Sequence, residues 1–434
     1  MVPGREEPCS AVVNDAVVSA VTAPSTFADL SREELAVLVP ELLLCGHLID
    51  RSGMPYLIEA FGREGMTAVA IEEWQAASPV YTRRMQRALD FEGDSVETIF
   101  KGLQLDIGAP PQFMDFRYRV DDHDHGEFRL DHCGALMDVE PMGDEYVTAM
   151  CHDIEDPTFD ATALATNEYA QVRPIHRPPR SPVDRSPHCA WTVTIDHANV
   201  PPAVQPHMVT IGRSAAASLE LSPIHTGGAG RHDYTGPLLS DVRFDDFSQS
   251  ALVRMAEEVC LQQHLLNLGF LLAVQARADE DVALGIGRKQ LTGIAGLTSE
   301  RIRDALGLPD DLSGLAAVLA VHPAFNPPQY VHVEVVLGDR LVIRLGRDAA
   351  ADQDGAWPTL VDGDHLEPLN ALVRGVNPRF SVKVLEEDAA ALTVEVVTED
   401  SPVEEASEVA LTRFSTGANF AFADRGIPLP LTVI

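Results

Sequence analysis

The side chains most suited to chemistry gather at residues 131–157. This stretch, DHCGALMDVEPMGDEYVTAMCHDIEDP, holds two cysteines, two histidines and eight carboxylates. Thiolate and imidazole groups are ligands for zinc or iron, and a thiol beside a proton acceptor can act as a nucleophile. The alternative is an acidic surface over two buried thiols, because cysteine also packs as a small apolar side chain.

The thiols have neighbours that suit a shared site. Cys133 follows Asp131 by two residues, so both should lie on one face of a strand. On the next helix Cys151 belongs to an apolar face, and His152 lies nearer the rim on the face of Glu155 and Asp156. We predict that the three thiols come together, close enough to share either one ion, zinc or iron, or one pocket. The predicted ligands are Cys133, Cys151, Cys189, His132 and His188.

Not every histidine can be a ligand. His132 and His188 directly precede cysteines on predicted strands, so they should point to the opposite face. In a catalytic reading Cys151 or a metal-bound water attacks, His152 or His188 moves protons, and Asp153 orients them. A second reading is a non-catalytic protein that binds a metal, haem or another small ligand. A third is an interaction module whose cysteines are only core.

Other histidines have structural explanations. His123 and His125 belong to the turn DDHDHG, which is typical of a polar surface loop, although an H-x-H pair could supply two ligands. His47 and His264 lie on apolar helix faces, which favours hydrogen-bonded core histidines. His47, beside Cys45, is a weaker site candidate. The Arg-rich segment RPIHRPPRSPVDR, or a cation, could compensate the carboxylates at 153–156.

The elements that must position these residues occur twice. At a constant offset of 217 in residue number, Glu41, His47 and Arg84 meet Glu258, His264 and Arg301, and the Pro-Pro-Gln at 110–112 meets the one at 327–329. Self-similarity at one offset indicates an internal duplication. Each copy reads as two helical stretches, a short helix, a hairpin, a further helix and strands. Asp94 and Asp311 are the predicted N-caps of the short helices.

The pattern predicts an α+β fold with two tandem copies of a domain of helices and antiparallel strands. We expect a flexible arm at residues 1–25, a Cys/His-bearing domain at 26–199, a linker at 200–242 and a degenerate second copy at 243–434. The helix after each hairpin should end before a proline, at Asp156 and Asn377. The copies should pack as a pseudo-dimer, and homo-oligomers are compatible with this. The site should lie in the first copy, because the second lacks the thiols.

The spacing of the first copy resembles a known family. A hairpin leads to a cysteine, and a Cys-x-Asp follows on a helix, then an Asp-Pro and a strand cysteine near an aromatic residue. This order resembles the L-2-amino-thiazoline-4-carboxylic acid hydrolase-like family and is similar to the related 4-vinyl-reductase domains, which share an α+β fold with haem-nitric-oxide-binding domains. The resembling residues are Cys133, Cys151, Asp153, Asp156, Pro157, Cys189 and Trp191. The resemblance implies a small-ligand pocket with functional cysteines, in a hydrolase or a ligand-binding domain; members usually have one such domain.

Composition narrows the function further. The net charge of −34 disfavours nucleic acid and anionic membrane surfaces as partners. Six cysteines in 434 residues do not form a disulfide framework, which favours a reducing, cytoplasmic location. We therefore expect a thiol- or metal-dependent enzyme, a hydrolase of the aminothiazoline-carboxylate type acting on a small molecule, or else a small-ligand-binding protein.

Overall fold

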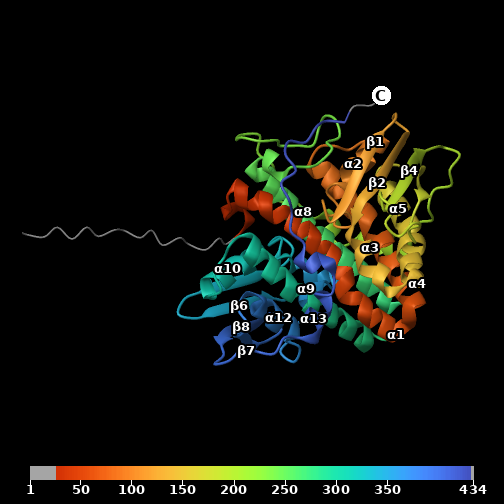
Figure 1. Ribbon diagram of the computed structural model, residues 1–434. Helices are drawn as coiled ribbons and strands as arrows, with labels where there is room; N and C mark the ends of the chain where they lie inside the picture. The colour runs from red at the N-terminus through yellow and green to blue at the C-terminus, as the bar shows by residue number, and fades with distance from the viewer. Residues whose placement is uncertain (1–25, 432–434) are drawn as a thin grey trace, which may run out of the picture.

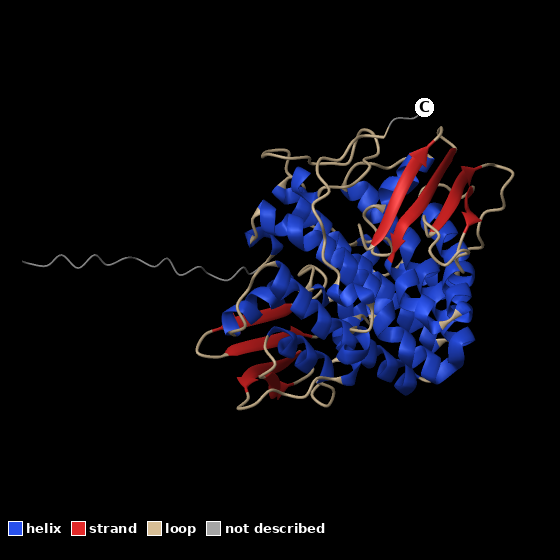
Figure 2. Ribbon diagram, in the orientation of Figure 1, coloured by secondary structure: helices blue, strands red, loops and turns tan. Residues whose placement is uncertain are grey.

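The computed structural model describes residues 26–431, so the predicted arm at residues 1–25 lies outside the described residues. Two four-stranded antiparallel sheets lie at opposite ends of a helical centre (Figures 1 and 2). Their strand orders match: β1-β2-β4-β3 in the N-terminal domain (26–199) and β5-β6-β8-β7 in the C-terminal domain (243–399). The predicted α+β class with two similar domains is confirmed. The duplication itself stays a prediction from the constant offset.

The N-terminal domain consists of α1 (Arg32–Ala88), α2 (Val96–Leu103), β1 (Met114–Val120), β2 (His125–Cys133), α3 (Gly134–Val139), α4 (Asp144–Thr148), α5 (Glu155–Leu164), β3 (Ala170–His176) and β4 (Cys189–Ile195). A connecting segment, residues 200–242, carries α6 (Pro206–Ile211) and α7 (Ala215–Ser218). The C-terminal domain consists of α8 (Gln249–Gln275), α9 (Glu280–Ala305), α10 (Leu312–Val321), β5 (Val333–Leu337), β6 (Leu341–Gly346), α11 (Ala350–Asp354), α12 (Glu367–Val376), β7 (Phe380–Glu387) and β8 (Ala391–Thr398). A C-terminal segment, residues 400–431, includes α13 (Ser407–Thr412).

The long helix α1 corresponds to two helices of the C-terminal domain. Its regular geometry breaks at Gly62, where φ is 70°, a left-handed conformation that glycine adopts without steric cost. In the C-terminal domain the chain leaves the helix between α8 and α9 instead. Ser31 and Ser248, which match at the offset of 217, cap α1 and α8 by accepting hydrogen bonds from Glu34 and Ala251.

Two sequence-based details of the N-terminal domain are wrong. Ser95, not Asp94, caps α2, because the Asp94 side chain instead contacts His123 in the hairpin turn; Asp311 does cap α10. The helix does not end at Asp156 but continues through Pro157 to Leu164, since proline is tolerated in the first turn of α5. α12 does end before Asn377.

Asn167, not Asp156, matches Asn377. Each asparagine accepts a hydrogen bond from the N–H two residues later. Each also donates from its amide to the carbonyl of an aspartate before the short helix, Asp94 or Asp310. The offset in residue number between the domains is therefore 210 in this part of the fold instead of 217.

Two buried ion pairs join the domains reciprocally. Arg84 of the N-terminal domain donates to Glu258 of the C-terminal domain at 2.8 Å, and Arg301 donates to Glu41 at 2.7 Å. At the offset of 217 the two arginines match each other, and so do the two glutamates. Such an exchange of identical contacts is the property of a two-fold interface. The four residues fix how α1 and α9 pack on the helices of the other domain.

The same arginines hold the segments that follow each domain. Arg84 donates to the carbonyls of Ala217 and Leu219, and Arg301 donates to those at residues 417, 418 and 420. A carboxylate of the opposite domain binds each segment as well. Asp354 accepts from the N–H groups at residues 215 and 216, and Asp138 accepts from the N–H of Thr416.

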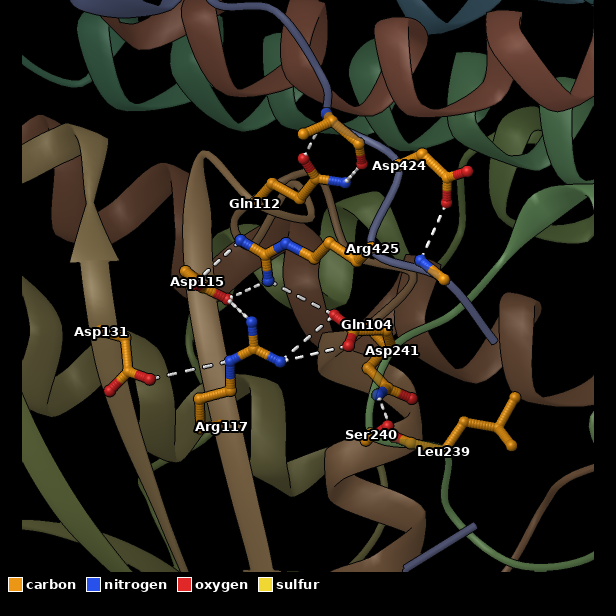
Figure 3. Close-up of polar contacts among 12 residues, drawn as sticks. Gln104, Gln112, Asp115, Arg117, Asp131, Leu239, Ser240, Asp241, Asp424 and Arg425 are labelled. Atoms are coloured by element: carbon orange, nitrogen blue, oxygen red, sulfur yellow. Dashed lines mark hydrogen bonds and ion pairs between the residues drawn. The ribbon is translucent and has the colours of Figure 1, made fainter. Parts of the chain in front are cut away.

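The chain end returns to the N-terminal sheet (Figure 3). Arg425 donates to both oxygens of Asp115 at 2.6 and 3.0 Å, and Arg117 of β1 pairs with Asp115 at 2.9 Å and with Asp241 at 3.1 Å. Gln112 exchanges two hydrogen bonds with the backbone of Ala423. The predicted linker is therefore a packed segment, and its Asp241 contacts Arg425 of the C-terminal segment in this network of ion pairs. None of the helices in the described part of the chain is long and apolar enough to cross a membrane.

Removing one partner of a reciprocal pair should be costly. We expect Arg301→Met to lower the free energy of unfolding by roughly 3–5 kcal/mol, because it leaves the buried Glu41 without its cation. Arg84→Met should cost less, because Arg254 still pairs with Glu258. Urea unfolding measures the change. The control Arg340→Met breaks the exposed pair with Glu395 and should cost no more than about 1 kcal/mol. Equal losses for Arg301→Met and the control would contradict a structural role for the pair.

Candidate functional site

The three predicted thiols lie in one region of the N-terminal core. Cys133, Cys151 and Cys189 are each at most 4% exposed, and Cys133 and Cys189 both lie near enough to Cys151 to raise its pKa. All are free thiols. Burial raises the pKa of each, that of Cys133 to about 12, and the charge of Glu155 raises all three further. Such thiols stay protonated at neutral pH and are poor nucleophiles or metal ligands.

A bulge in β2 separates Cys133 from Asp131. Between Met114 and Phe116 of β1, the facing strand advances from Cys133 to Leu130, so it carries an extra residue there. Asp131 is consequently exposed while Cys133 is buried, and the prediction that both share a face is wrong. The rings of His132 and His188 approach each other at 5.8 Å, and the Cys133 thiol instead contacts the Met114 sulfur at 3.7 Å.

No group of three or more His, Cys, Asp or Glu side chains within residues 26–431 has a geometry that could hold a metal ion. The predicted set of Cys133, Cys151, Cys189, His132 and His188 therefore does not fit zinc or iron in this conformation. The side chains of the three predicted catalytic residues also lie in different surroundings. Cys151 is buried, His152 contacts the carbonyl of Pro178 at 2.7 Å, and Asp153 is exposed.

The remaining predicted polar residues have surface partners. His123 and His125 lie in the exposed turn, where bonds to Asp124, Asp94 and Asp122 raise their pKa values. Arg177 and Arg180 of the Arg-rich segment pair with Asp156 at 2.5 Å and with Glu140 at 2.7 Å. Of the carboxylates at 153–156, the Arg-rich segment thus pairs with Asp156.

A cavity beside the thiols is the stronger candidate. It has a volume of about 90 Å³ and lies between α1, the residues before and within β1, and α5. Its apolar lining includes Met54, Trp74, Met114, Met150, Phe116 and Phe159. Its polar lining consists of His47, Asp50, Arg51, Asp106, Glu155, Thr158 and Thr162. We call it the inner cavity. Met150 and Ile154 reach it from the π-helix Ala149–Ile154, a rare geometry that recurs at functional sites.

Several polar groups of the inner cavity lack partners. Both imidazole nitrogens of His47, Oδ2 of Asp106 and Oε2 of Glu155 are buried without a hydrogen bond to any described residue. Burial lowers the pKa of His47 to about 3 and raises that of Asp106 to about 6. Burial, with the nearby Asp156 charge, raises the pKa of Glu155 to about 8 against the opposing effect of Arg177. Unpaired titratable groups at a cavity mark a functional-site candidate.

Asp50 and Glu73 form a carboxyl pair at the edge of this cavity. Trp74 donates to one oxygen of Asp50 at 2.8 Å, while the other, like Oε2 of Glu73, has no donor. Burial raises the pKa of both groups, and the Asp50 charge raises that of Glu73 further. Because ionised carboxylates only accept hydrogen bonds, a proton on Glu73 is what can join the pair.

The C-terminal domain has neutral residues at the matching positions. Asn267 and Gln290 match Asp50 and Glu73 at the offset of 217, and both are buried in α8 and α9. Leu291 and Phe325 stand at the positions of Trp74 and Gly108 and line a cavity of about 20 Å³ with apolar residues. A cavity lined by titratable side chains is therefore found in the N-terminal domain, the domain in which the sequence analysis expected the site.

A second cavity adjoins the first toward the domain interface. It has a volume of about 210 Å³ and shares Arg51, Met54, Met150 and Ile154 with the inner cavity. Leu411, Phe414 and Ser415 of the C-terminal segment line its other side, and Phe414 is 84% exposed. Arg51 contacts Asp138 at 3.2 Å between the two cavities. We call this the outer cavity.

Sequence reasoning did not single out most of the polar residues that line the inner cavity. It weighed His47 as a core histidine and Glu155 as part of an acidic helix, and it missed Asp50, Glu73 and Asp106. One signal was present in the sequence. At the offset of 217, Asp50 corresponds to Asn267 and Glu73 corresponds to Gln290. An acid within an apolar helix of one copy is thus replaced by the corresponding amide in the other copy.

Comparison of the chain with protein-family models, with curated proteins and with solved structures finds no match. The resemblance to the aminothiazoline-carboxylate hydrolase-like family therefore rests on the spacing of the cysteines alone.

We expect Cys151→Ala to behave as a small core substitution. It should lower the free energy of unfolding by about 1 kcal/mol through the cavity left by the sulfur. Elemental analysis should find the same metal content in the variant and the parent protein. Loss of a stoichiometric metal from Cys151→Ala would instead restore the predicted metal site.

Glu155 should make stability depend on pH. Its folded-state pKa of about 8 lies above the ordinary 4.5, so the folded state keeps a proton that the unfolded state releases. This contribution to stability is present at low pH and is lost as pH rises through 8. Between pH 6.5 and 8 the free energy of unfolding of the parent protein should fall relative to that of Glu155→Gln, by at most about 1.4 kcal/mol per pH unit.

Urea unfolding at several pH values measures this difference. The control Glu64→Gln changes an exposed carboxylate of α1 and should run parallel to the parent protein. Parallel curves for Glu155→Gln as well would show that Glu155 ionises normally.

Proposed function

We propose that the protein binds a small molecule in the inner cavity of its N-terminal domain. One observation carries the proposal: buried polar groups without partners converge on a cavity that is apolar and nearly filled at the matching place in the C-terminal domain. Leaving polar groups buried and unpaired costs free energy, so their retention beside a cavity favours a function. The outer cavity supplies an apolar approach.

A second proposal is that the protein transforms this molecule, as the predicted hydrolase would. The raised pKa of Glu155, about 8, favours it, since a carboxyl group that is protonated at neutral pH can act as a general acid. In this version Glu155 and Asp106 take the role that the sequence reading gave to Cys151 and His152. If it holds, Glu155→Gln should bind the molecule and fail to convert it, whereas Cys151→Ala should retain turnover.

Ligand-observed NMR with a fragment library tests the binding proposal. The library contains equal numbers of cationic, anionic and neutral compounds. Thr162 lines the inner cavity, and Leu372, its match at the offset of 210, lines the smaller cavity of the C-terminal domain. Thr162→Leu should therefore reduce the space and weaken bound fragments at least about tenfold.

The control Thr194→Leu makes the same change on β4, away from either cavity, and should leave fragment binding unchanged. If no fragment binds in a way that depends on Thr162, the inner cavity is not a ligand site and the proposal fails.

A further inference from the structure

Carboxyl groups outnumber basic side chains in the lining of the inner cavity. His47, Asp50 and Asp106 are 6%, 8% and 3% exposed, and each turns an unpaired atom to the protein interior beside the cavity that it lines. The donors that reach these carboxylates come from Trp74, Tyr81 and the N–H of Gly108. Tyr81 and Gly108 share one oxygen of Asp106 and leave the other without a partner, and Trp74 occupies one oxygen of Asp50 while the other faces Glu73.

The positively charged side chain that lines the inner cavity is already paired with a carboxylate outside its lining. Arg51 is the basic residue of the lining, apart from the neutral His47, and it contacts Asp138 at 3.2 Å. Against it stand Asp50, Asp106 and Glu155 in the lining, with Glu73 behind Asp50. An anion would face these carboxyl groups at close range, so an anionic ligand is disfavoured. A metal ion is disfavoured too, since the described side chains do not converge in ligand geometry.

The apolar lining limits the size and shape of a ligand. Trp74 presents an indole at the carboxyl pair, and an aromatic face attracts ammonium or guanidinium groups. Met54 and Met150 border both cavities, and methionine adapts to varied hydrocarbon shapes. A head group of a few atoms would fill the inner cavity, and an apolar chain would extend toward the outer one.

We propose that the ligand is a small organic cation, a primary ammonium or guanidinium compound with a short apolar chain, whose N–H groups donate to Asp50 and Asp106. This inference rests on the proposed binding function and specifies the ligand class of the same cavity. The neutral Asn267 and Gln290 of the C-terminal domain show that this packing accommodates amides in place of the acids.

Binding should depend on pH in a defined direction. Asp106 faces Tyr81, Thr82 and the Gly108 N–H; Asp50 faces Glu73, Trp74 and Arg51. The pKa of Asp106 is raised to about 6, so this carboxyl group is mostly protonated at pH 5 and ionised at pH 7. A cation favours the ionised form. Affinity for a cation should therefore rise at least about threefold from pH 5 to pH 7.

Isothermal titration calorimetry with n-butylammonium, n-butylguanidinium, n-butanol and butyrate tests the proposal on the full chain. We expect the cations to bind at least about tenfold more tightly than n-butanol and butyrate. The double variant Asp50→Asn/Glu73→Gln gives the pair the residues of the C-terminal domain and should weaken cation binding at least about tenfold, as should Asp106→Asn. Glu64→Gln, an equal change of charge on the exposed face of α1, should not.

The outcomes separate the ligand class from the binding site. Equal affinity for n-butanol and n-butylammonium, or cation binding that survives both acid variants, would overturn the cation proposal. If fragments sensitive to Thr162→Leu are neutral or anionic, the site stands and the cation class fails. If cations bind but Thr162→Leu has no effect, they bind elsewhere and both proposals fail. The pH dependence of the parent protein decides the matter even if a variant does not fold.

Discussion

The fold depends on two arginine guanidinium groups that are buried where the domains meet. Neither Arg84 nor Arg301 can be left without a carboxylate, because an unpaired charge is far more costly inside a protein than in water. Each finds its carboxylate, Glu258 or Glu41, on the other domain. The remaining N–H groups of each guanidinium donate to carbonyls of the segment that follows its domain. One constraint thus fixes the domain interface and the course of both segments.

A symmetrical frame of this kind lets the two domains differ in their interiors. The pair Asp50 and Glu73 and the pair Asn267 and Gln290 occupy matching places on matching helices. The amides add no charge to the core of the C-terminal domain, whose neighbouring cavity is small and apolar. The acids make the N-terminal core electrostatically costly, as the raised pKa values show. The C-terminal domain contributes packing and counter-charges to the frame, and the N-terminal domain carries the groups that can act on a ligand.

Much of the fold could be predicted from the sequence, and the site could not. A constant offset fixes the order of elements, and alternating hairpins are a strong local signal, so both domains and their hairpins were found. The strand face of Cys133 was predicted wrongly because one extra residue near Asp131 reverses the alternation of buried and exposed side chains along β2. A bulge of a single residue has no clear signal in the sequence. The thiols drew attention because cysteine and histidine are common metal ligands, yet burial keeps these thiols protonated. Asp106 was invisible because its importance comes from a cavity formed by residues far apart in the chain.

The domain interface and the candidate site share one residue, Asp138. In its structural role it accepts from Thr416 of the C-terminal segment, just as Asp354 accepts from the connecting segment near α7. Asp138 also holds Arg51 between the inner and outer cavities, whereas the match of Arg51 in the C-terminal domain is the apolar Leu268. The C-terminal segment that Asp138 binds also lines the outer cavity. A shift of this segment would therefore alter the position of Arg51, and with it the boundary of the inner cavity. The packing that makes the fold symmetrical thus also connects the C-terminal segment to Arg51 and the outer cavity.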